Sequence, residues 1–454
     1  MAEYHVENFG CRASRADGEI ISAELRHRGL SPALSPAQAD VIVANTCSVT
    51  AQADRTARAF LRRVHRQNPT ARILVTGCYA QRAPQEVAAL PGVHAVIGNS
   101  HKGLVPEIAR QAAGFVPLAA LQPAAALYVD DSFAHAELAM PSGGWWVDGS
   151  TGEQTRPNLK VQDGCGNRCS FCIIPTTRGH SRSLPIEACL SNVQAFTAGG
   201  GTELVLSGIN LGRWGKDLKP QQTLEELVSA ILLRTALPRL RLSSIEPMDW
   251  TPQLLALFRD YSAVSGTHGG RLARHAHLPL QSGSDAILRS MHRRYRPWHY
   301  AEKLRLIRES MPDAAIGADV MVGFPGESEA LFEESFALIA AQPFTYLHLF
   351  PFSARPGTRA WQLAREYPVP PQAVAERMGR LRGLIAARNH VFRQRFVGRS
   401  LPAVTLHAAP DAVPRALTDN FLEVHLNQRV PSNQSVRVRV TGLTDGGLNA
   451  TLGA

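Results

Sequence analysis

Short apolar runs alternate with helical segments along most of this chain, and the alternation limits the folds that it can adopt. Before residue 113 the pairs are YHVEN with GEIISAELRHRG, DVIVAN with RTARAFLRRVHRQ, and RILVTG with PQEVAAL. Strands that alternate with helices predict a parallel sheet covered on its faces, so the expected fold class is α/β. In an open sheet of this kind the carboxyl ends of the strands share one edge, where ligands bind.

The alternation returns between residues 157 and 352. Its candidate strands are LKVQ, TELVLSG, RLRLSSIEP, HAHLPLQSG, IGADVMVGF and YLHLFPF. Six such units predict a (β/α)6 partial barrel, a fold whose chemistry lies at the carboxyl ends of the strands. After a helical segment, the runs FLEVHL and SVRVRVTG predict a small antiparallel β-barrel. The expected domains are 1–113, 154–392 with the exit helix, and 393–454, joined by an Ala-, Pro-, Gly- and Ser-rich linker at 114–153.

Composition sets broader limits. Net charge is +10, from 48 basic and 38 acidic residues, which is consistent with a polyanionic partner but does not identify one. An odd number of cysteines, seven in 454 residues, argues against a disulfide framework and favours a reducing, cytoplasmic compartment. The start shows no signal-peptide pattern, and no apolar run is long enough to span a bilayer, so no membrane partner is expected.

Three cysteines lie close together in VQDGCGNRCSFCIIP, directly after the predicted strand LKVQ. Cys165, Cys169 and Cys172 have the spacing C-x3-C-x2-C, which fits three corners of an iron–sulfur cluster. Zinc sites usually draw four ligands from two CxxC knuckles, and no second knuckle is near this loop. Three ligands would leave one iron open to a cofactor. The alternative is a set of three structural thiols in a glycine-rich loop.

Three more cysteines each follow a predicted strand. Cys11 comes after YHVENFG, Cys47 after DVIVANT, and Cys78 after RILVTG. Equivalent strand ends bring them to one edge of the sheet, which predicts a second three-cysteine iron–sulfur site. The alternative is that each is a small buried hydrophobic residue, the usual environment of a cysteine outside a disulfide. Cys189, inside the helical segment PIEACLSNV, has no matching partner and is expected in the core.

The cysteine loop, with Phe171 before its last cysteine, resembles the signature of the radical S-adenosylmethionine (SAM) enzymes. With the second trio and the terminal barrel, the chain resembles the methylthiotransferases over essentially its whole length: a cluster domain, a radical SAM core and a TRAM domain. VTGCYAQ, SGINLGRWGKDL, SSIEPMDW, HLPLQSGSDAILRSMHRRY, FPFSARPGT and LTDNFLEV look most like the group that acts on threonylcarbamoyladenosine in tRNA. One departure is Ser14, where many relatives carry Asn; it is expected to change hydrogen bonding around the cluster.

This resemblance implies two [4Fe–4S] clusters and SAM. The cluster at Cys165, Cys169 and Cys172 would bind SAM and cleave it to a 5′-deoxyadenosyl radical, and the cluster at Cys11, Cys47 and Cys78 would carry the sulfur. The methylthio group would go to C2 of the adenine next to the anticodon. Implied partners are the tRNA anticodon loop, an electron donor and a sulfur source. Alternatives are an enzyme for isopentenyladenosine or for a ribosomal-protein aspartate, and an iron–sulfur RNA-binding protein without catalysis.

The resemblance also suggests contact residues. For SAM these are Phe171, Gly200, Gly201, Glu203 and Arg178. A glycine run also commonly ends a helix, and an arginine is often simply solvated. Arg182 is a further candidate, His292 and Tyr295 are candidates for RNA contact or helix packing, and Phe324 lies in a GFPGE turn. Arginines of the terminal segment, on a strand face or a solvated surface, could track a phosphate backbone: Arg393, Arg395, Arg399, Arg415, Arg429, Arg437 and Arg439.

Overall fold

A computed structural model describes residues 2–113, 125–133, 138, 155–262, 269–409 and 411–453. The chain forms two compact units. The first comprises Met1–Trp145, Lys160–Ser183 and Ser353–Trp361, and the second comprises Trp146–Leu159, Leu184–Phe352 and Gln362–Ala454. The six cysteines of both trios therefore belong to the first unit, and the C-terminal barrel belongs to the second. The division into three domains and a linker expected from the sequence stays a prediction.

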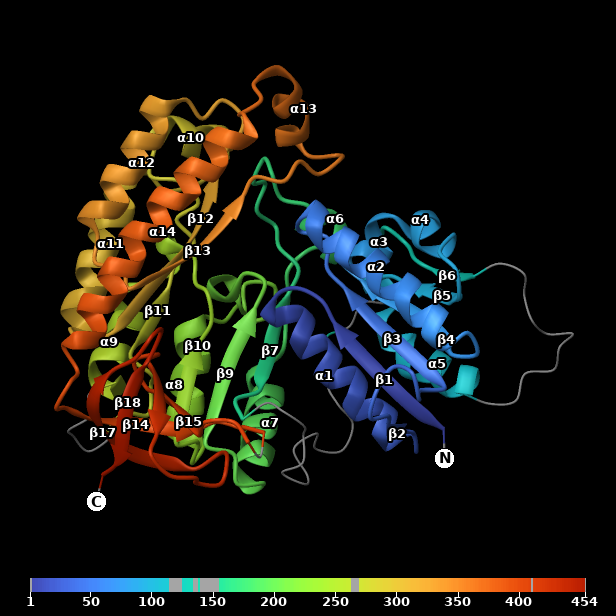
Figure 1. Ribbon diagram of the computed structural model, residues 1–454, viewed down its shortest axis with the longest axis horizontal. Coiled ribbons are helices and arrows are strands. Elements are labelled where there is room, and N and C mark those ends of the chain that lie inside the picture. Colours follow the sequence, from blue (N-terminus) through green and yellow to red (C-terminus); the bar gives the residue numbers. More distant parts are fainter. Residues whose placement is uncertain are drawn as a thin grey trace, which may run out of the picture. The chain divides into compact units, whose positions relative to one another are not determined.

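A parallel sheet forms the centre of the first unit (Figure 1). Its strands are β1 (Glu3–Asn8), β2 (Ser31–Pro32), β3 (Val41–Thr46), β4 (Arg72–Gly77), β5 (Val93–Ile97) and β6 (Ala126–Tyr128). They lie in the order β2-β1-β3-β4-β5-β6, and every pairing is parallel. The expected linker 114–153 thus contributes strand β6, and most of its other residues lie outside the described part of the chain.

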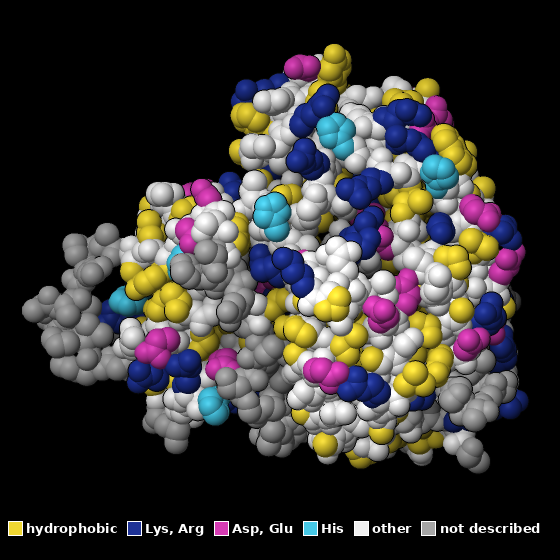
Figure 2. Space-filling model, turned by 180° about the vertical axis from the view of Figure 1, so that it is seen from behind, with side chains coloured by type: hydrophobic (Ala, Val, Ile, Leu, Met, Phe, Trp, Pro, Cys, Tyr) yellow, Lys and Arg dark blue, Asp and Glu magenta, His cyan; other side chains and the backbone are white. Residues whose placement is uncertain are grey.

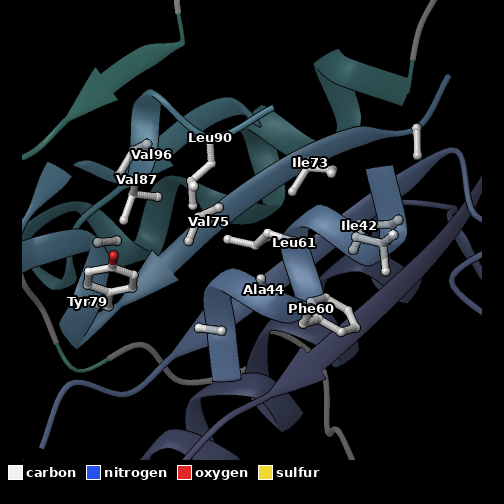
Figure 3. Close-up of a cluster of buried hydrophobic side chains, with 14 of the residues drawn as sticks. Ile42, Ala44, Phe60, Leu61, Ile73, Val75, Tyr79, Val87, Leu90 and Val96 are labelled. Atoms are coloured by element: carbon white, nitrogen blue, oxygen red, sulfur yellow. The ribbon is translucent and has the colours of Figure 1, made fainter. Parts of the chain in front are cut away.

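Helices cover both faces of this sheet. They are α1 (Arg12–His27), α2 (Ala51–Gln67), α3 (Cys78–Arg82), α4 (Pro84–Ala88), η1 (Asn99–Leu104) and α5 (Val105–Ala113). Alternate residues of β3 enter two cores: Ile42 and Ala44 pack with Phe60 of α2 (Figure 3), whereas Val41 and Val43 pack in a cluster with residues of α1 and α5. Burial on both faces explains why the strands read as continuous apolar runs. Each buried Val, Leu or Ile contributes about 1.5–3 kcal/mol.

Strand β7 (Asn158–Asp163) begins in the second unit and ends in the first, where α6 (Ile174–Arg178) and β8 (Arg182–Ser183) follow it. In the second unit, strands again alternate with helices. The strands are β9 (Glu203–Gly208), β10 (Arg239–Leu242), β11 (His275–His277), β12 (Ala315–Val322) and β13 (Tyr346–Pro351). The helices are α7 (Ile186–Ala198), η3 (Leu211–Arg213), α8 (Leu224–Arg234), η4 (Pro247–Asp249), α9 (Pro252–Ser262), α10 (Asp285–Ser290), α11 (Pro297–Ser310), α12 (Glu329–Ala341), α13 (Arg359–Glu366, which begins in the first unit) and α14 (Pro371–Gln394). The predicted α/β class with its barrel-type core is confirmed.

The C-terminal segment forms a closed barrel in the order β14-β15-β16-β18-β17. Its strands are β14 (Ser400–Thr405), β15 (Arg415–Thr418), β16 (Glu423–Leu426), β17 (Ser435–Leu443) and β18 (Leu448–Leu452). The barrel is mixed, because β16 and β18 pair in parallel while the other pairings are antiparallel. Arg274 binds the carboxylate of Asp419 at 2.6 and 3.0 Å, and Ala315 of β12 packs in the barrel core. The barrel is therefore joined to the strands of its own unit.

Charge on the surface is mixed. On the face seen in Figure 2, Lys and Arg side chains are spread among Asp and Glu. Among the described helices, none is both long and apolar enough to cross a membrane.

Candidate iron–sulfur sites

The first trio of cysteines lies at the ends of neighbouring strands. Cys11 is the residue before α1, Cys47 directly follows β3, and Cys78 directly follows β4. Gly10 packs so closely on Cys47 that a Cβ there would lie 2.7 Å from the Cys47 sulfur. Burial, and then the neighbouring Cys78 and Cys11 thiolates, raise the pKa of Cys47 to about 12. The structure brings the three residues together, as their strand ends predict; their binding of a cluster stays a prediction.

Polar groups contact the sulfur atoms of this trio. The Asn99 side chain donates to Cys78 Sγ at 3.4 Å and to the Thr177 carbonyl at 2.7 Å. Ser14 Oγ lies 3.7 Å from Cys11 Sγ, and Arg178 Nη2 donates to the same hydroxyl at 3.4 Å. Hydrogen bonds to ligand sulfurs tune an iron–sulfur cluster, so Asn99 and Ser14 are positioned for that role. The expectation that Ser14 affects bonding near Cys11 has a direct geometric basis.

A buried charge network lies beside the trio. Arg178, only 1% exposed, donates to both carboxylate oxygens of Asp163 at 3.0 Å and to Asp17 at 3.1 Å. Lys102 binds Asp17 at 2.6 Å, and Lys160 binds both Asp17 and Asp163. Three cations therefore face two carboxylates. Since buried charges need partners, the excess positive charge suits a site that gathers thiolates.

The pKa shifts agree with this arrangement. Burial would lower the pKa of Arg178, but Asp163, Cys78, Asp17 and Cys11 together raise it well above its usual value. Burial would raise the pKa of Asp17, but Lys102, Lys160 and Arg178 hold it well below its usual range. The network thus stays charged, and it joins α1, η1, β7 and α6 within the first unit.

The turn after Cys47 is fixed by a second ionic cluster. Asp54 near the start of α2 accepts from Ser48 Oγ at 2.7 Å and from Arg82 at 2.9 Å. Arg355 also binds the Asp54 carboxylate, and it donates to Ser48 Oγ at 2.8 Å. Thr50 caps α2 by accepting from the Ala53 amide at 3.1 Å. These contacts hold the strand-to-helix turn that carries Cys47.

The second trio lies in the loop after β7. Gly164 adopts φ +74°, and a Cβ there would meet the His180 carbonyl at 2.0 Å, so the turn requires glycine. The Cys165 amide donates to the Gly179 carbonyl at 3.0 Å, and the Cys172 amide donates to the Cys169 carbonyl at 3.1 Å. All three cysteines of the loop are half-buried. Backbone hydrogen bonds at both ends therefore hold a short loop with accessible sulfurs.

A backbone amide also contacts a sulfur of the loop trio. The Asn167 amide donates to Cys165 Sγ at 3.4 Å. Hydrogen bonds to the sulfurs help to set the reduction potential of an iron–sulfur cluster. Cluster binding by the loop trio stays a prediction.

Glu203 lies at the opposite end of the barrel strands from the expected chemistry. It is the first residue of β9, fully buried, and its carboxylate is bound by Arg241 at 2.8 Å and by Arg156 and Arg239 at 3.3 Å. Burial would raise the pKa of Glu203, but the three arginines lower it to about 2. Because barrel chemistry lies at the carboxyl ends, the predicted SAM contact stays a prediction that this geometry does not favour.

The glycine run before Glu203 ends helix α7. The Gly200 amide donates to the Thr197 carbonyl and the Gly201 amide to the Phe196 carbonyl, both at 3.0 Å, and Gly200 has φ +83°. A Cβ on Gly201 would meet the Phe196 ring at 2.2 Å. This is a glycine helix end of the common type. The glycines are explained by chain geometry, and their contact with SAM stays a prediction.

The remaining candidates fall into different environments. Phe171 is half-buried in the loop, and Arg182 donates to the Arg178 carbonyl at 3.0 Å. Tyr295 is buried and donates to the Leu280 carbonyl at 2.7 Å, whereas His292 is exposed. Phe324 is buried against the Phe352 ring. Cys189 is buried in α7, as predicted for core packing.

The seven arginines of the terminal segment also divide. Arg395 and Arg399 bind Asp313, and Arg415 binds Glu423. Arg393 donates to the Thr444 and Gly447 carbonyls, and Arg429 donates to the Ala409 and Ala412 carbonyls. Arg437 and Arg439, two residues apart on β17, are exposed and lack an acidic partner among the described residues.

Sequence reasoning missed the buried network and the Asp54 cluster. One signal was present: Lys160 lies between the apolar Leu159 and Val161 on a predicted strand, and a lysine on a buried strand needs a partner. Asp17, Asn99 and Arg355 gave no such signal, since their partners are distant in sequence.

Known protein families match both parts of the chain that carry the cysteine trios. A family model described as "Uncharacterized protein family UPF0004" matches residues 3–98, and the "Radical SAM superfamily" model matches residues 159–339. The first contains Cys11, Cys47 and Cys78, and the second contains Cys165, Cys169 and Cys172. The chain is 32% identical over 434 residues to the threonylcarbamoyladenosine tRNA methylthiotransferase MtaB of Aquifex aeolicus, covering 96% of this chain and 99% of that protein.

Two further likenesses add to this. The tRNA-2-methylthio-N(6)-dimethylallyladenosine synthase of Sphingopyxis alaskensis is 33% identical over 406 residues, covering 87% of this chain and 85% of that one. The radical SAM methyltransferase TsrM of Kitasatospora setae, solved with cobalamin and a [4Fe–4S] cluster, is 12% identical with a TM-score of 0.56, covering 82% of this chain and 80% of that chain. This last likeness concerns the fold alone.

Proposed function

We propose that this chain, which belongs to the methylthiotransferase family of radical SAM enzymes, adds a methylthio group to C2 of N6-threonylcarbamoyladenosine next to the anticodon of tRNA. Relatives aligned over nearly the whole chain support the broader assignment, a radical SAM methylthiotransferase that acts on tRNA. The observation that carries the proposal is the gathering of Cys11, Cys47 and Cys78 beside a buried positive network. That arrangement supports a second cluster in the same unit as the Cys165 loop.

Cysteines of the loop would hold the [4Fe–4S] cluster that binds SAM. When bound, the cluster and SAM together would supply a radical able to activate an unreactive C–H position, and this chemistry belongs to the cofactor. The loop's own task is to present Cys165, Cys169 and Cys172 with one coordination position open. The hydrogen bonds at Gly179 and inside the loop fix that presentation.

The N-terminal trio would hold a second cluster, which carries the sulfur. Arg178 places positive charge beside the thiolates, Lys160 is joined to it through Asp17, and Asn99 donates to a ligand sulfur. These residues would bind and orient the cysteine ligands, and the burial of Cys47 and Cys78 would keep water away from the cluster. An electron donor and a sulfur source are the further partners this chemistry needs, and a tRNA substrate implies a cytoplasmic reaction.

The choice of nucleoside rests on motifs and coverage. The relatives named for threonylcarbamoyladenosine align over 93–98% of this chain and 90–99% of their own length. The dimethylallyladenosine synthases align over 87–98% of this chain and 76–85% of their own length, at 31–33% identity. Similar identities keep isopentenyladenosine as the second candidate. In either case the target base lies in a single-stranded loop, where it can be splayed out for reaction.

Nucleoside mass spectrometry tests the substrate. The reconstituted enzyme would be given SAM, a reductant and sulfide with either threonylcarbamoylated or isopentenylated tRNA. A ribosomal protein, digested and analysed as peptides by mass spectrometry, would serve as a third substrate. We expect a methylthio product on the threonylcarbamoylated tRNA. Preferential modification of isopentenylated tRNA or of the ribosomal protein would overturn the substrate and leave the family assignment intact.

A further inference from the structure

Three metal-binding side chains meet on adjacent strands of the second unit. His277 ends β11, Asp319 lies in the middle of β12, and His348 is the third residue of β13. Asp319 pairs with His348, and His277 pairs with Gly317, two residues before Asp319. Side chains two residues apart on a strand share a face, so all three side chains project from one face of this parallel sheet. Helix α14 packs against β12 and β13 of this sheet (Figure 1).

The distances fit ligands of a single ion. His277 Nε2 and His348 Nδ1 each lie 3.4 Å from the same oxygen, Asp319 Oδ1. The three ligand atoms lie within 4.8 Å of one another. With metal–ligand bonds of about 2.0–2.1 Å, two ligands of a tetrahedral ion are about 3.4 Å apart. A direct hydrogen bond would bring the nitrogen to about 2.9 Å from the oxygen.

The burial of His277 also points to a bound ligand. Its residue surface is 7% exposed, and its Nε2 atom is buried with no hydrogen-bond partner within the described chain. A buried polar atom normally has a partner, so this nitrogen calls for one. The Asp319 carboxylate on the neighbouring strand lies 3.4 Å from this nitrogen, within reach of the same ion.

His275 and Tyr346, which lie two residues before His277 and His348 on the same strands, close the site on one side. His275 Nε2 lies 2.7 Å from the Tyr346 hydroxyl, and the Tyr346 ring lies over Gly317, where a Cβ would meet the hydroxyl at 2.4 Å. The same ring lies 5.8 Å from His277 and 5.4 Å from His348. Gly317 therefore makes room for the Tyr346 ring, which packs against the rings of both His277 and His348. His348, whose side chain is 55% exposed, leaves the site open on the other side.

We propose that His277, Asp319 and His348 form a binding site for one divalent transition cation of the Zn²⁺ class. Two imidazoles and one carboxylate are a donor set that suits such ions. Three protein donors leave at least one position for an oxygen ligand, such as water or a carboxylate. None of its donors is a cysteine of either trio.

Metal analysis tests the site on the full chain with its clusters reconstituted, so that the cysteines are occupied. After treatment with a chelator that spares the clusters, the protein would be equilibrated with Zn²⁺ and the bound zinc counted. We expect one zinc ion per chain and a rise in Tm with added zinc, because an ion that binds only the folded state stabilises it. His348→Ala, at an exposed position, is expected to fold and to lose both effects.

Two further variants sharpen the test. Asp319→Asn keeps the side-chain shape, removes the charge, and is expected to lose the zinc. His299→Ala, an exposed histidine on α11, should retain it. Absence of bound zinc in the wild type, or equal binding by wild type, His348→Ala and Asp319→Asn, would overturn the proposal. The iron content, measured in the same samples, shows that a loss of zinc is not a loss of the clusters.

Discussion

The two cysteine trios occupy one unit but are built in opposite ways. The loop trio comes from eight consecutive residues, is half-buried, and is held by local backbone hydrogen bonds. The N-terminal trio comes from three strand ends and is surrounded by side chains from distant parts of the sequence, Asn99 and Arg178 among them. In that trio Cys47 and Cys78 are buried, whereas Cys11 is exposed.

The difference teaches which features each site depends on. A loop of fixed spacing presents its ligands wherever the loop is anchored, so its signature is readable in sequence. A trio assembled from strand ends depends on the sheet, on the turns after each strand, and on buried ion pairs that compensate one another. The first site is therefore sensitive to its own three cysteines, and the second also to residues that never touch the metal.

The largest expected effect is loss of all chemistry from a single loop substitution. Cys169→Ala removes one of three ligands of the SAM-binding cluster and should abolish both 5′-deoxyadenosine formation and methylthio transfer. Both products would be measured by mass spectrometry after anaerobic reconstitution. Cys189→Ala, a buried cysteine in α7 outside both trios, is the matched control and should keep both activities. Cleavage of SAM by Cys169→Ala would contradict the assignment of the loop.

Substitution of the other trio should separate the two activities. The Cys11→Ala/Cys47→Ala/Cys78→Ala protein is expected to cleave SAM and to make no methylthiolated tRNA. Its iron and sulfide content should fall to about half, the share of one of two equal clusters. A triple variant that still transfers methylthio groups would show that this trio is not the sulfur carrier. An unchanged iron content would show that it holds no cluster.

The buried network should matter for stability and for the N-terminal cluster alone. Asp17→Asn leaves Lys102, Lys160 and Arg178 with one carboxylate among them, and breaking a buried ionic set costs about 3–5 kcal/mol. Denaturant unfolding of the protein before reconstitution measures this loss. Glu187→Gln, which removes an exposed ion pair with Arg234, is the control and should change stability little.

Iron content distinguishes a structural effect from one on the cluster. If the network also positions the thiolates, a folded Asp17→Asn protein should lose N-terminal iron more readily than loop iron. Equal stability of wild type and variant would mean that Asp17 is not an essential partner of these cations.

The sequence predicts the fold further than it predicts the sites. Strand–helix alternation gave the parallel sheet and the barrel core, because buried strands read as apolar runs and helices between them have their own period. Strand ends also predicted that Cys11, Cys47 and Cys78 meet. The partners of Arg178 and Asp54 were not predictable, since an ion pair between residues 161 positions apart, such as Arg178 and Asp17, leaves no local pattern.

Two sequence patterns also fit structures other than the ones that they suggested. Glycine followed by an acidic residue suggested a SAM contact at Gly200, Gly201 and Glu203, but the same letters also describe a helix end and a buried partner for arginines. The parallel pairing of β16 with β18 was missed because hairpin-like runs predict antiparallel neighbours, whereas barrel closure joins strands distant in sequence.

A moderate effect is expected on tRNA affinity. Deleting residues 400–454 would expose the core that Phe396 and Ala315 share with the barrel, so point substitutions are the cleaner test. Arg437→Glu/Arg439→Glu, at exposed positions of β17, should weaken tRNA binding and reduce the slope of log affinity against log salt by about 2, about 1 for each phosphate contact. SAM cleavage without tRNA should be unchanged.

The matched charge change for a single β17 substitution, Arg437→Glu, is Arg259→Glu on an exposed turn of α9 in the same unit. It alters net charge by as much as one of the β17 substitutions but should leave the salt slope near that of the wild type. If both proteins lose affinity equally, the effect is general charge and the β17 arginines are not phosphate contacts.

The smallest expected effect concerns Ser14. Its hydroxyl lies 3.7 Å from Cys11 Sγ and accepts from Arg178, so Ser14→Ala removes a polar neighbour of one ligand sulfur without removing a ligand. Fewer hydrogen bonds to a thiolate lower the reduction potential of a cluster, so the N-terminal cluster should become slightly harder to reduce. Redox titration followed by electron paramagnetic resonance measures this, with the loop cluster of the same protein as the internal reference. A shift confined to the loop cluster, or an equal shift of both, would mean that Ser14 does not act through Cys11.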